Sequence, residues 1–156
     1  MVTDLFGTVL QELSKSMQIA ELRPDKNNSC LLRLRGGLEI QIEFDRPGQF
    51  ILLCSDLGAV PPGKYRENLF REALRANGLP HPIHGVLAYS RKTDHLILFE
   101  KTSVKDLNGE KIAASIPLFS QKASIWKDAL ERGEIPSLDQ AVAGLRSTGG
   151  MFGLKP

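Results

Sequence analysis

Apolar residues recur at every third or fourth position in three stretches of the chain, which is the spacing of an amphipathic helix. These stretches cover residues 3–18, 65–76 and 109–132. In the last of them the apolar seam consists of Ile112, Ile116, Phe119, Ala123, Trp126 and Leu130. Pro117 lies inside this third stretch, and we expect a kink or a break near it because proline lacks a backbone N–H and crowds the preceding turn.

Five other stretches have the apolar pattern of β-strands. Residues 38–44, LEIQIEF, alternate between an apolar and a polar face without a fault, as in a strand with one buried and one wet face. Gly36-Gly37 is a two-residue hairpin signal that joins this strand to one over residues 30–35. The remaining strands are expected at residues 49–54, 85–90 and 95–101. Two prolines and two glycines predict a loop over residues 55–64.

These elements follow one another in the order α-β-β-β-α-β-β-α. Because short hairpins link most of the strands, we expect a twisted antiparallel sheet of about five strands with three helices, a fold of the α+β class. A single domain is predicted over residues 1–132, followed by a glycine-rich tail over residues 133–156 with a short helix at 138–146. Met151 and Phe152 lie among the tail's glycines, which is typical of a mobile end; a ligand role for them is the alternative.

The composition is that of a globular protein, with 42% hydrophobic and 24% charged residues in a chain of 156. The formal net charge of +2 is too small to indicate nucleic-acid binding, and the strand at 38–44 exposes acidic side chains that would repel phosphate. No segment resembles a secretion signal or a membrane span, which predicts a cytoplasmic protein without membrane insertion. In that compartment Cys30 and Cys54 are expected to be reduced.

Candidate chemistry is sparse along the chain. His81 and His84 lie in a proline-bracketed segment without a third ligand at a recognisable spacing, so we expect no metal site. Neither a nucleophile elbow nor a phosphate-binding glycine motif is present. Asp106 and Glu110 are interpreted as charges near a helix N-terminus rather than as an acid/base pair. We therefore expect no enzyme activity and no cofactor, with a loop-borne site around the two histidines as the competing reading.

Apolar surface is what this sequence has in excess. The strands at 49–54 and 95–101 are apolar on both faces, and the first helix has a wide apolar sector. Three helices cannot easily cover both sides of a five-stranded sheet. Some of this surface is therefore expected to meet another chain.

The pattern resembles the class I type III secretion chaperones, the Tir chaperone (CesT-like) family. The resemblance covers residues 3–132 and rests on the opening helix, the strand LEIQIEF, the helix YRENLFREALRANGL and the segment HLILFEKTSVKDLNGEKIAASIPLFSQKASIW. It implies a bacterial cytoplasmic homodimer. Such a chaperone binds the N-terminal chaperone-binding segment of secreted effector proteins, keeps it extended and soluble, and targets it to the secretion apparatus, with the secretion ATPase as a further partner. The alternative is a non-catalytic adaptor or assembly factor of the same architecture without a secreted client.

The resemblance also implies two sets of site residues. The dimer interface would involve Leu69, Phe70, Ala73, Leu74, Leu87 and Tyr89. The effector-binding set would comprise Leu5, Phe6, Val9, Leu31, Ile40, Ile42 and Phe44. For each of these residues a place in the protein's own core is the alternative, and Leu5 and Val9 are favoured as contacts because they flank the main apolar stripe. Residues 30–35 are the candidate edge strand.

Overall fold

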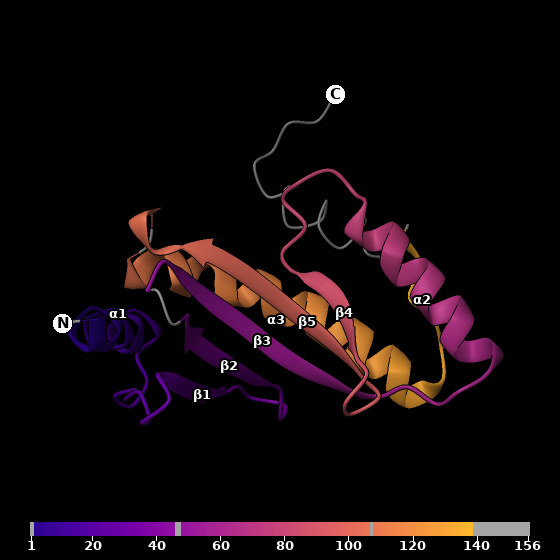
Figure 1. Ribbon diagram of the computed structural model, residues 1–156, viewed down its shortest axis with the longest axis horizontal. Helices are drawn as coiled ribbons and strands as arrows, with labels where there is room; N and C mark the ends of the chain where they lie inside the picture. The colour runs from indigo at the N-terminus through magenta and orange to yellow at the C-terminus, as the bar shows by residue number, and fades with distance from the viewer. Residues whose placement is uncertain (1, 46–47, 107, 139–156) are drawn as a thin grey trace.

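Three α-helices and a five-stranded antiparallel sheet make up the described part of the chain (Figure 1). The computed structural model describes residues 2–45, 48–106 and 108–138. The elements are α1 (Val2–Met17), β1 (Ser29–Arg33), β2 (Glu39–Phe44), β3 (Phe50–Ala59), α2 (Lys64–Asn77), β4 (Val86–Ser90), β5 (His95–Ser103) and α3 (Gly109–Arg132), with a 3₁₀ turn at Val104–Asp106. This confirms the predicted fold class and the predicted order of elements.

The strands lie in the order β1-β2-β3-β5-β4, so β1 and β4 form the two edges of the sheet. The loop predicted over residues 55–64 is wrong for its first half, because β3 continues to Ala59. Pairing with β5 holds this extension, and a β-bulge between Asp56 and Gly58 absorbs the irregularity. Gly58 has a φ of 119°, a value that glycine adopts readily.

The turn between β1 and β2 is longer than the two-residue hairpin that the sequence predicts. The Leu34 N–H donates to the Leu38 carbonyl at 2.9 Å, which leaves three residues, 35–37, in the turn. Gly36 and Gly37 have φ values of 92° and 88°, so the glycine pair does supply the backbone conformation that the reversal needs.

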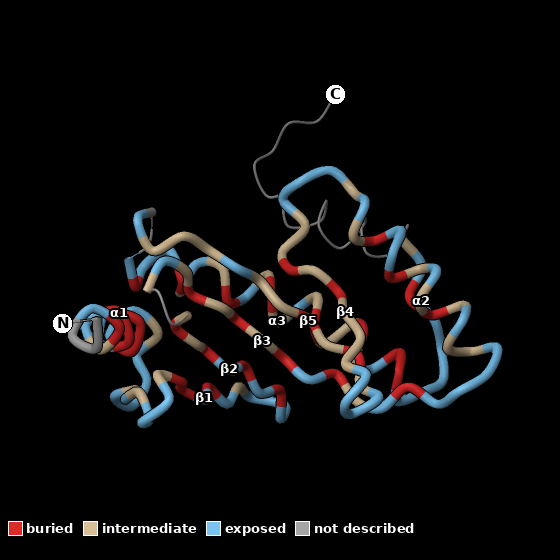
Figure 2. Tube along the Cα trace, in the orientation of Figure 1, coloured by how far each residue is buried: buried red, intermediate tan, exposed pale blue. Residues whose placement is uncertain are grey.

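The main core lies between α3 and the face of the sheet that it covers (Figures 1 and 2). All six apolar residues of the predicted α3 seam are buried, Ile112, Ile116, Phe119, Ala123, Trp126 and Leu130. Of the kink or break predicted near Pro117, the break is wrong, since α3 is continuous from Gly109 to Arg132. Packing of the seam on both sides of Pro117 holds the helix together despite the missing N–H.

Helix α1 packs against the beginning of α3. The Gly109 N–H donates to the Glu12 carboxylate at 2.9 Å, while Asn108 caps the helix by accepting from the Lys111 N–H at 2.9 Å. A Cβ at position 109 would lie only 2.3 Å from the Cβ of Glu12 and 2.6 Å from the backbone nitrogen of Leu13. The two helices therefore meet at a distance that only glycine allows.

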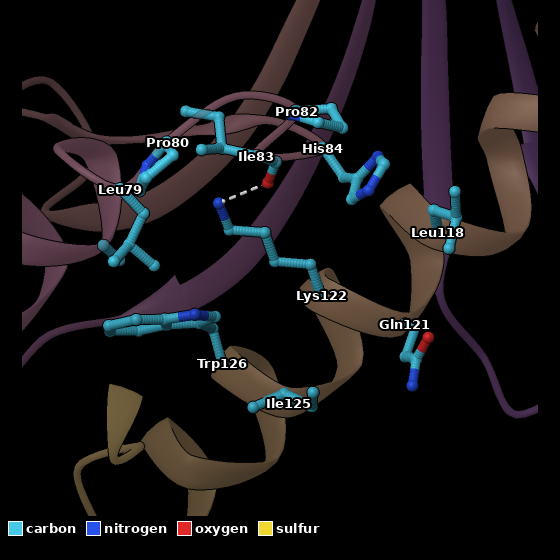
Figure 3. A pocket seen from close by; sticks show the side chains of 11 residues that line it. Leu79, Pro80, Pro82, Ile83, His84, Leu118, Gln121, Lys122, Ile125 and Trp126 are labelled. Carbon is cyan, nitrogen blue, oxygen red and sulfur yellow. Dashed lines mark hydrogen bonds between the residues drawn. The ribbon is translucent and has the colours of Figure 1, made fainter. Parts of the chain in front are cut away.

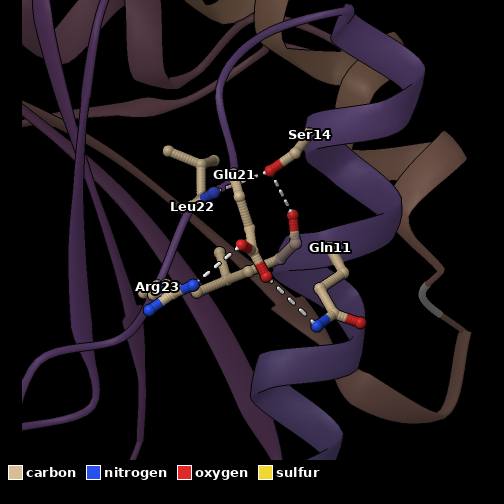
Figure 4. Close-up of polar contacts among 6 residues, drawn as sticks. Gln11, Ser14, Glu21, Leu22 and Arg23 are labelled. Atoms are coloured by element: carbon tan, nitrogen blue, oxygen red, sulfur yellow. Dashed lines mark hydrogen bonds and ion pairs between the residues drawn. The ribbon is translucent and has the colours of Figure 1, made fainter.

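Polar contacts fix the chain where it leaves α1 (Figure 4). The buried Ser14 hydroxyl donates to the Leu10 carbonyl at 2.8 Å and accepts from the Leu22 N–H at 2.9 Å. Nearer the surface, the Glu21 carboxylate accepts a hydrogen bond from the Gln11 side-chain amide at 3.4 Å and forms an ion pair with Arg23 at 3.1 Å. Ser14 therefore ties the segment after α1 back to its last turns.

The helix predicted at 138–146 and the tail with Met151 and Phe152 lie outside the described residues, except for Leu138. None of the helices in the described ranges is both long enough and apolar enough to cross a membrane.

Replacing Gly109 with alanine should destabilise the fold by about 1–3 kcal/mol, because the added methyl group overlaps the α1 backbone. The free energy of unfolding from urea titration would measure the effect. Gly7→Ala is the matched control: apart from its chain neighbours and the backbone of its own helix, no atom lies within 4 Å of its Cβ position, and alanine favours the helix interior by up to about 1 kcal/mol. Equal stability of the two variants would contradict the close crossing.

Candidate protein-binding surfaces

An apolar surface lies where α2 runs beside the edge strand β4. Five of the six residues predicted for the dimer interface, all except Leu69, line one groove there: Phe70, Ala73, Leu74, Leu87 and Tyr89. We call these five residues the α2–β4 surface. Leu69 is fully buried beneath it and belongs to the core.

The α2–β4 surface is ordered by contacts within the chain but is not covered by the described residues. The rings of Phe70 and Tyr89 lie 4.9 Å apart, and the Arg66 guanidinium lies 5.3 Å from the centre of the Tyr89 ring. The Tyr89 hydroxyl is hydrogen-bonded to Asp94. Leu74 is 72% exposed, the largest value among the exposed large apolar side chains of the described residues. Exposure of a leucine on an otherwise ordered apolar groove is typical of a surface that another protein covers.

Asn77 holds α2 against β4. Its side-chain amide donates to the Leu87 carbonyl at 2.9 Å, and its side-chain oxygen accepts from the Leu87 N–H at 2.9 Å. The carboxamide thus satisfies both outward-facing backbone groups of one residue on an edge strand, as a neighbouring strand would.

The second face of the sheet carries apolar side chains that none of the three described α-helices covers. Cys54, Phe99 and Val86 lie next to one another on it across three strands, and all three are half-buried. The Lys101 ammonium group lies 4.0 Å from the centre of the Phe50 ring on the same face. Cys30 points to the opposite, α3-covered face, so the two thiols are separated by the sheet, and burial raises the pKa of both.

The predicted effector-binding residues divide into a buried and an exposed group. Leu5 on α1 is 45% exposed and Leu31 on β1 is 47% exposed. The other five are buried in the protein's own core: Phe6, Val9, Ile40, Ile42 and Phe44. The expectation that Val9 flanks the stripe and remains accessible is therefore wrong. These five side chains support the surface from below instead, for example through the stacked rings of Phe6 and Phe44, 5.3 Å apart.

Strand β1 is an open edge, in agreement with the prediction for residues 30–35. It pairs with β2 on one side, and no strand of the described ranges lies on its other side. Asp25 occupies only the first position of that edge, where its backbone and carboxylate bind Ser29. The backbone N–H and C=O groups of Cys30 and Leu32 are directed toward β2. Those of Leu31, which lies between them, therefore point outward, beside the exposed Leu31 side chain.

The three histidines lie at two separate places in the fold. His81 and His84 lie in the loop that leads into β4, and His95 pairs with the Asp56 carboxylate at 2.7 Å near the opposite end of β4. No group of three potential metal-ligating side chains occurs in the described ranges. Burial, together with the positive charge of Lys122, lowers the pKa of His84.

A small apolar pocket, which sequence reasoning missed, lies between this loop and α3 (Figure 3). We call it the loop–α3 pocket; its lining residues include Ala76, Leu79, Pro80, Leu118, Ile125 and Trp126, and its volume is about 210 Å³. Lys122 reaches across it and donates to the carbonyls of Ile83 at 2.8 Å and Gly85 at 2.7 Å. Burial lowers the pKa of Lys122 to about 8, against the opposing effect of Glu100. The helical spacing of Leu118, Lys122 and Trp126 was the only signal in the sequence.

The sequence model of the Tir chaperone protein (CesT) family matches residues 8–127. No curated protein matches the chain. Several solved structures share its fold. A chain of the HopA1–SchA chaperone–effector complex is 16% identical over 81% of this chain and 96% of its own length, with a TM-score of 0.66.

Two further structures give similar values. A chain of the heterodimeric ExoU–SpcU complex of the Pseudomonas aeruginosa type III secretion system is 17% identical, with coverage of 80% and 98% and a TM-score of 0.63. A chain of the Yersinia pestis complex between the type III secretion chaperone SycH and a fragment of YscM2 is 13% identical, with coverage of 76% and 96% and a TM-score of 0.58. At these identities the likeness concerns the fold.

The lowered pKa of Lys122 predicts a pH effect on stability. The unfolded chain keeps this lysine protonated to about pH 10.5, whereas the folded chain releases its proton near pH 8. Between these values the unfolded state binds more protons, so raising the pH favours folding through this group. The wild-type chain should therefore gain stability relative to Lys122→Met between about pH 8 and 10.5, as measured by urea unfolding.

The comparison with Lys122→Met removes the contributions of other groups that titrate at high pH, the cysteines among them. A difference in stability that stays constant over this pH range would contradict the lowered pKa.

Proposed function

The chain belongs to the Tir chaperone protein (CesT) family, and from this membership we propose that it is a type III secretion chaperone. It binds the N-terminal chaperone-binding segment of secreted effector proteins, keeps that segment extended and soluble, and targets it to the secretion apparatus. The family match over residues 8–127 is the observation that carries the proposal. It spans the sheet, α2 and most of α3, the elements that hold the apolar surfaces in place.

We propose that the effector segment is bound at the β1 edge. An extended peptide there can pair with the outward-facing backbone of β1 while its apolar side chains cover Leu31. Leu5 on α1 offers a second exposed apolar contact. This proposal retains the two exposed members of the expected set and uses the buried five as support. Edge pairing recognises backbone, which suits a chaperone that holds a segment in an extended form.

We also propose that two copies of the chain associate through the α2–β4 surface. A leucine as exposed as Leu74 beside two aromatic rings favours burial against a partner. A second copy places the same residues on both sides of the interface, as two-fold symmetry requires. The homodimer would work in the bacterial cytoplasm without enzyme activity or a cofactor, and its further partner would be the secretion apparatus or its ATPase.

An adaptor of the same architecture that binds a folded domain is the second candidate. The exposed β1 edge favours the chaperone, because a folded domain seldom offers an unpaired strand. The two are separated by the state of the bound protein. Amide hydrogen exchange of the bound effector segment should show protection only where it touches the chaperone. Protection throughout a compact domain would favour the adaptor.

Leu31→Glu should weaken effector binding by about 10- to 100-fold, since burial of a leucine contributes roughly 1.5–3 kcal/mol and each 1.4 kcal/mol changes Kd tenfold. The ligand is the N-terminal segment of a type III-secreted protein of the same organism, and calorimetry gives its Kd. Arg33→Glu is the control for added charge at the same edge. If both variants bind as wild type, the segment does not use the β1 edge.

Leu74→Glu should convert a dimer into a monomer, because it places two charges in the proposed interface. Light scattering of the wild type should give twice the chain mass of 17.2 kDa, and the variant should give that mass once. Leu5→Glu makes the same replacement at an exposed leucine outside α2 and β4 and should leave the dimer intact. A wild-type monomer at micromolar concentration would overturn the proposed dimer without deciding whether effectors bind.

A further inference from the structure

The loop–α3 pocket has the size and lining of a receptor for side chains rather than for a cofactor. Its volume of about 210 Å³ is below the range of roughly 300–1,000 Å³ that is usual for small-molecule sites. Leucine, proline, isoleucine and tryptophan side chains make up most of its wall (Figure 3). It is lined by neither Leu5, Leu31 nor any residue of the α2–β4 surface, so the proposed function does not use it.

The Lys122 ammonium group at the pocket is already engaged and adds little specificity for a charged ligand. Two of the three Lys122 hydrogens are held by the carbonyls of Ile83 and Gly85, which keeps the loop above the pocket in place. Glu100 compensates part of the lysine charge from β5. A suitable occupant is therefore one apolar side chain on a backbone that can approach closely.

The chain leaves α3 near the beginning of α2, and the other end of α2 borders the pocket. The Glu134 carbonyl accepts from the Tyr65 hydroxyl at 2.9 Å, next to the beginning of α2. From there the segment up to residue 138 runs back along α2 (Figure 1), and Leu138 packs against the core. Ala76 in the last turn of α2 and Leu79 just beyond it form a wall of the pocket. The end of the described chain is thus directed toward it.

Eighteen residues, 139–156, follow Leu138. At about 3.3 Å per residue they span up to roughly 60 Å when extended, more than the diameter on the order of 40 Å of a domain of this length. Phe152 is the only aromatic residue among them, and glycines at 149, 150 and 153 flank it. Glycines lower the steric cost of bringing backbone close to a wall.

We propose that the C-terminal tail is an internal ligand of the loop–α3 pocket and inserts Phe152 beside Trp126. The contact is made by the tail of the same chain. This contact gives the tail a binding role, which is the alternative that its sequence leaves open. An external apolar segment could then enter the pocket only by displacing Phe152.

Trp126 provides a specific reporter because the chain contains one tryptophan. Its indole N–H gives a single resonance in a ¹H–¹⁵N spectrum, and an aromatic ring packed beside it shifts that resonance. Phe152→Ser and a chain ending at Leu138 should both lose this shift, so that their indole resonances coincide. Leu154→Ser, the matched control, should keep the wild-type resonance. A peptide of residues 145–156 added to the shortened chain should restore the shift, and the same peptide with Phe152→Ser should not.

Each other result overturns the proposal. Identical indole resonances in the full chain, Phe152→Ser and the shortened chain would mean that the pocket serves another partner. A shift that grows with protein concentration would assign the inserted tail to a second copy of the chain. Neither result bears on effector binding, which the Leu31→Glu experiment tests separately.

Discussion

The close crossing of α1 and α3 at Gly109 is the contact on which the rest of the arrangement depends. Gly109 lets the backbone of α1 approach the first turn of α3, and the Glu12 carboxylate accepts the N–H that this turn leaves free. The start of α3 is thereby fixed relative to α1, and the buried seam of α3 then runs across the sheet. Because α1 is held in this orientation, Phe6 and Val9 face the core while Leu5 stays at the surface.

A second constraint is the shortage of covering elements. One face of the sheet is covered by α3, and the other carries half-buried apolar side chains that no helix in the described part of the chain meets. The remaining exposed leucines lie at separate places, Leu74 on α2 and Leu31 on the free edge of β1. This separation means that the proposed association of two copies and the proposed binding of a client would use different surfaces and need not compete.

Periodicity in the sequence was sufficient to predict the helices, the five strands and their order, because each depends on local spacing. The α3 seam is the clearest case, with all six predicted residues buried. The same patterns did not tell which apolar residues remain accessible. Ile40 and Leu31 are both apolar strand residues, yet one is buried and the other exposed, since the outcome depends on which face of the sheet the helices cover. The extension of β3 and the continuity of α3 through Pro117 likewise arise from tertiary pairing and packing that override local preference. The pocket near Lys122 depends on three segments that meet only in the folded chain.

Asn77 has a consequence for the chemical ageing of the protein. Its carboxamide both donates to and accepts from the backbone of Leu87, and Gly78 follows it in the chain. Asparagine is among the thermolabile residues, and a following glycine leaves its side chain little steric protection against loss of ammonia. An aspartate at this position could accept from the Leu87 N–H but could not donate to the carbonyl. As long as the fold is intact, the two hydrogen bonds hold the amide in place; once α2 separates from β4, deamidation would remove one of the two hydrogen bonds that draw them together again.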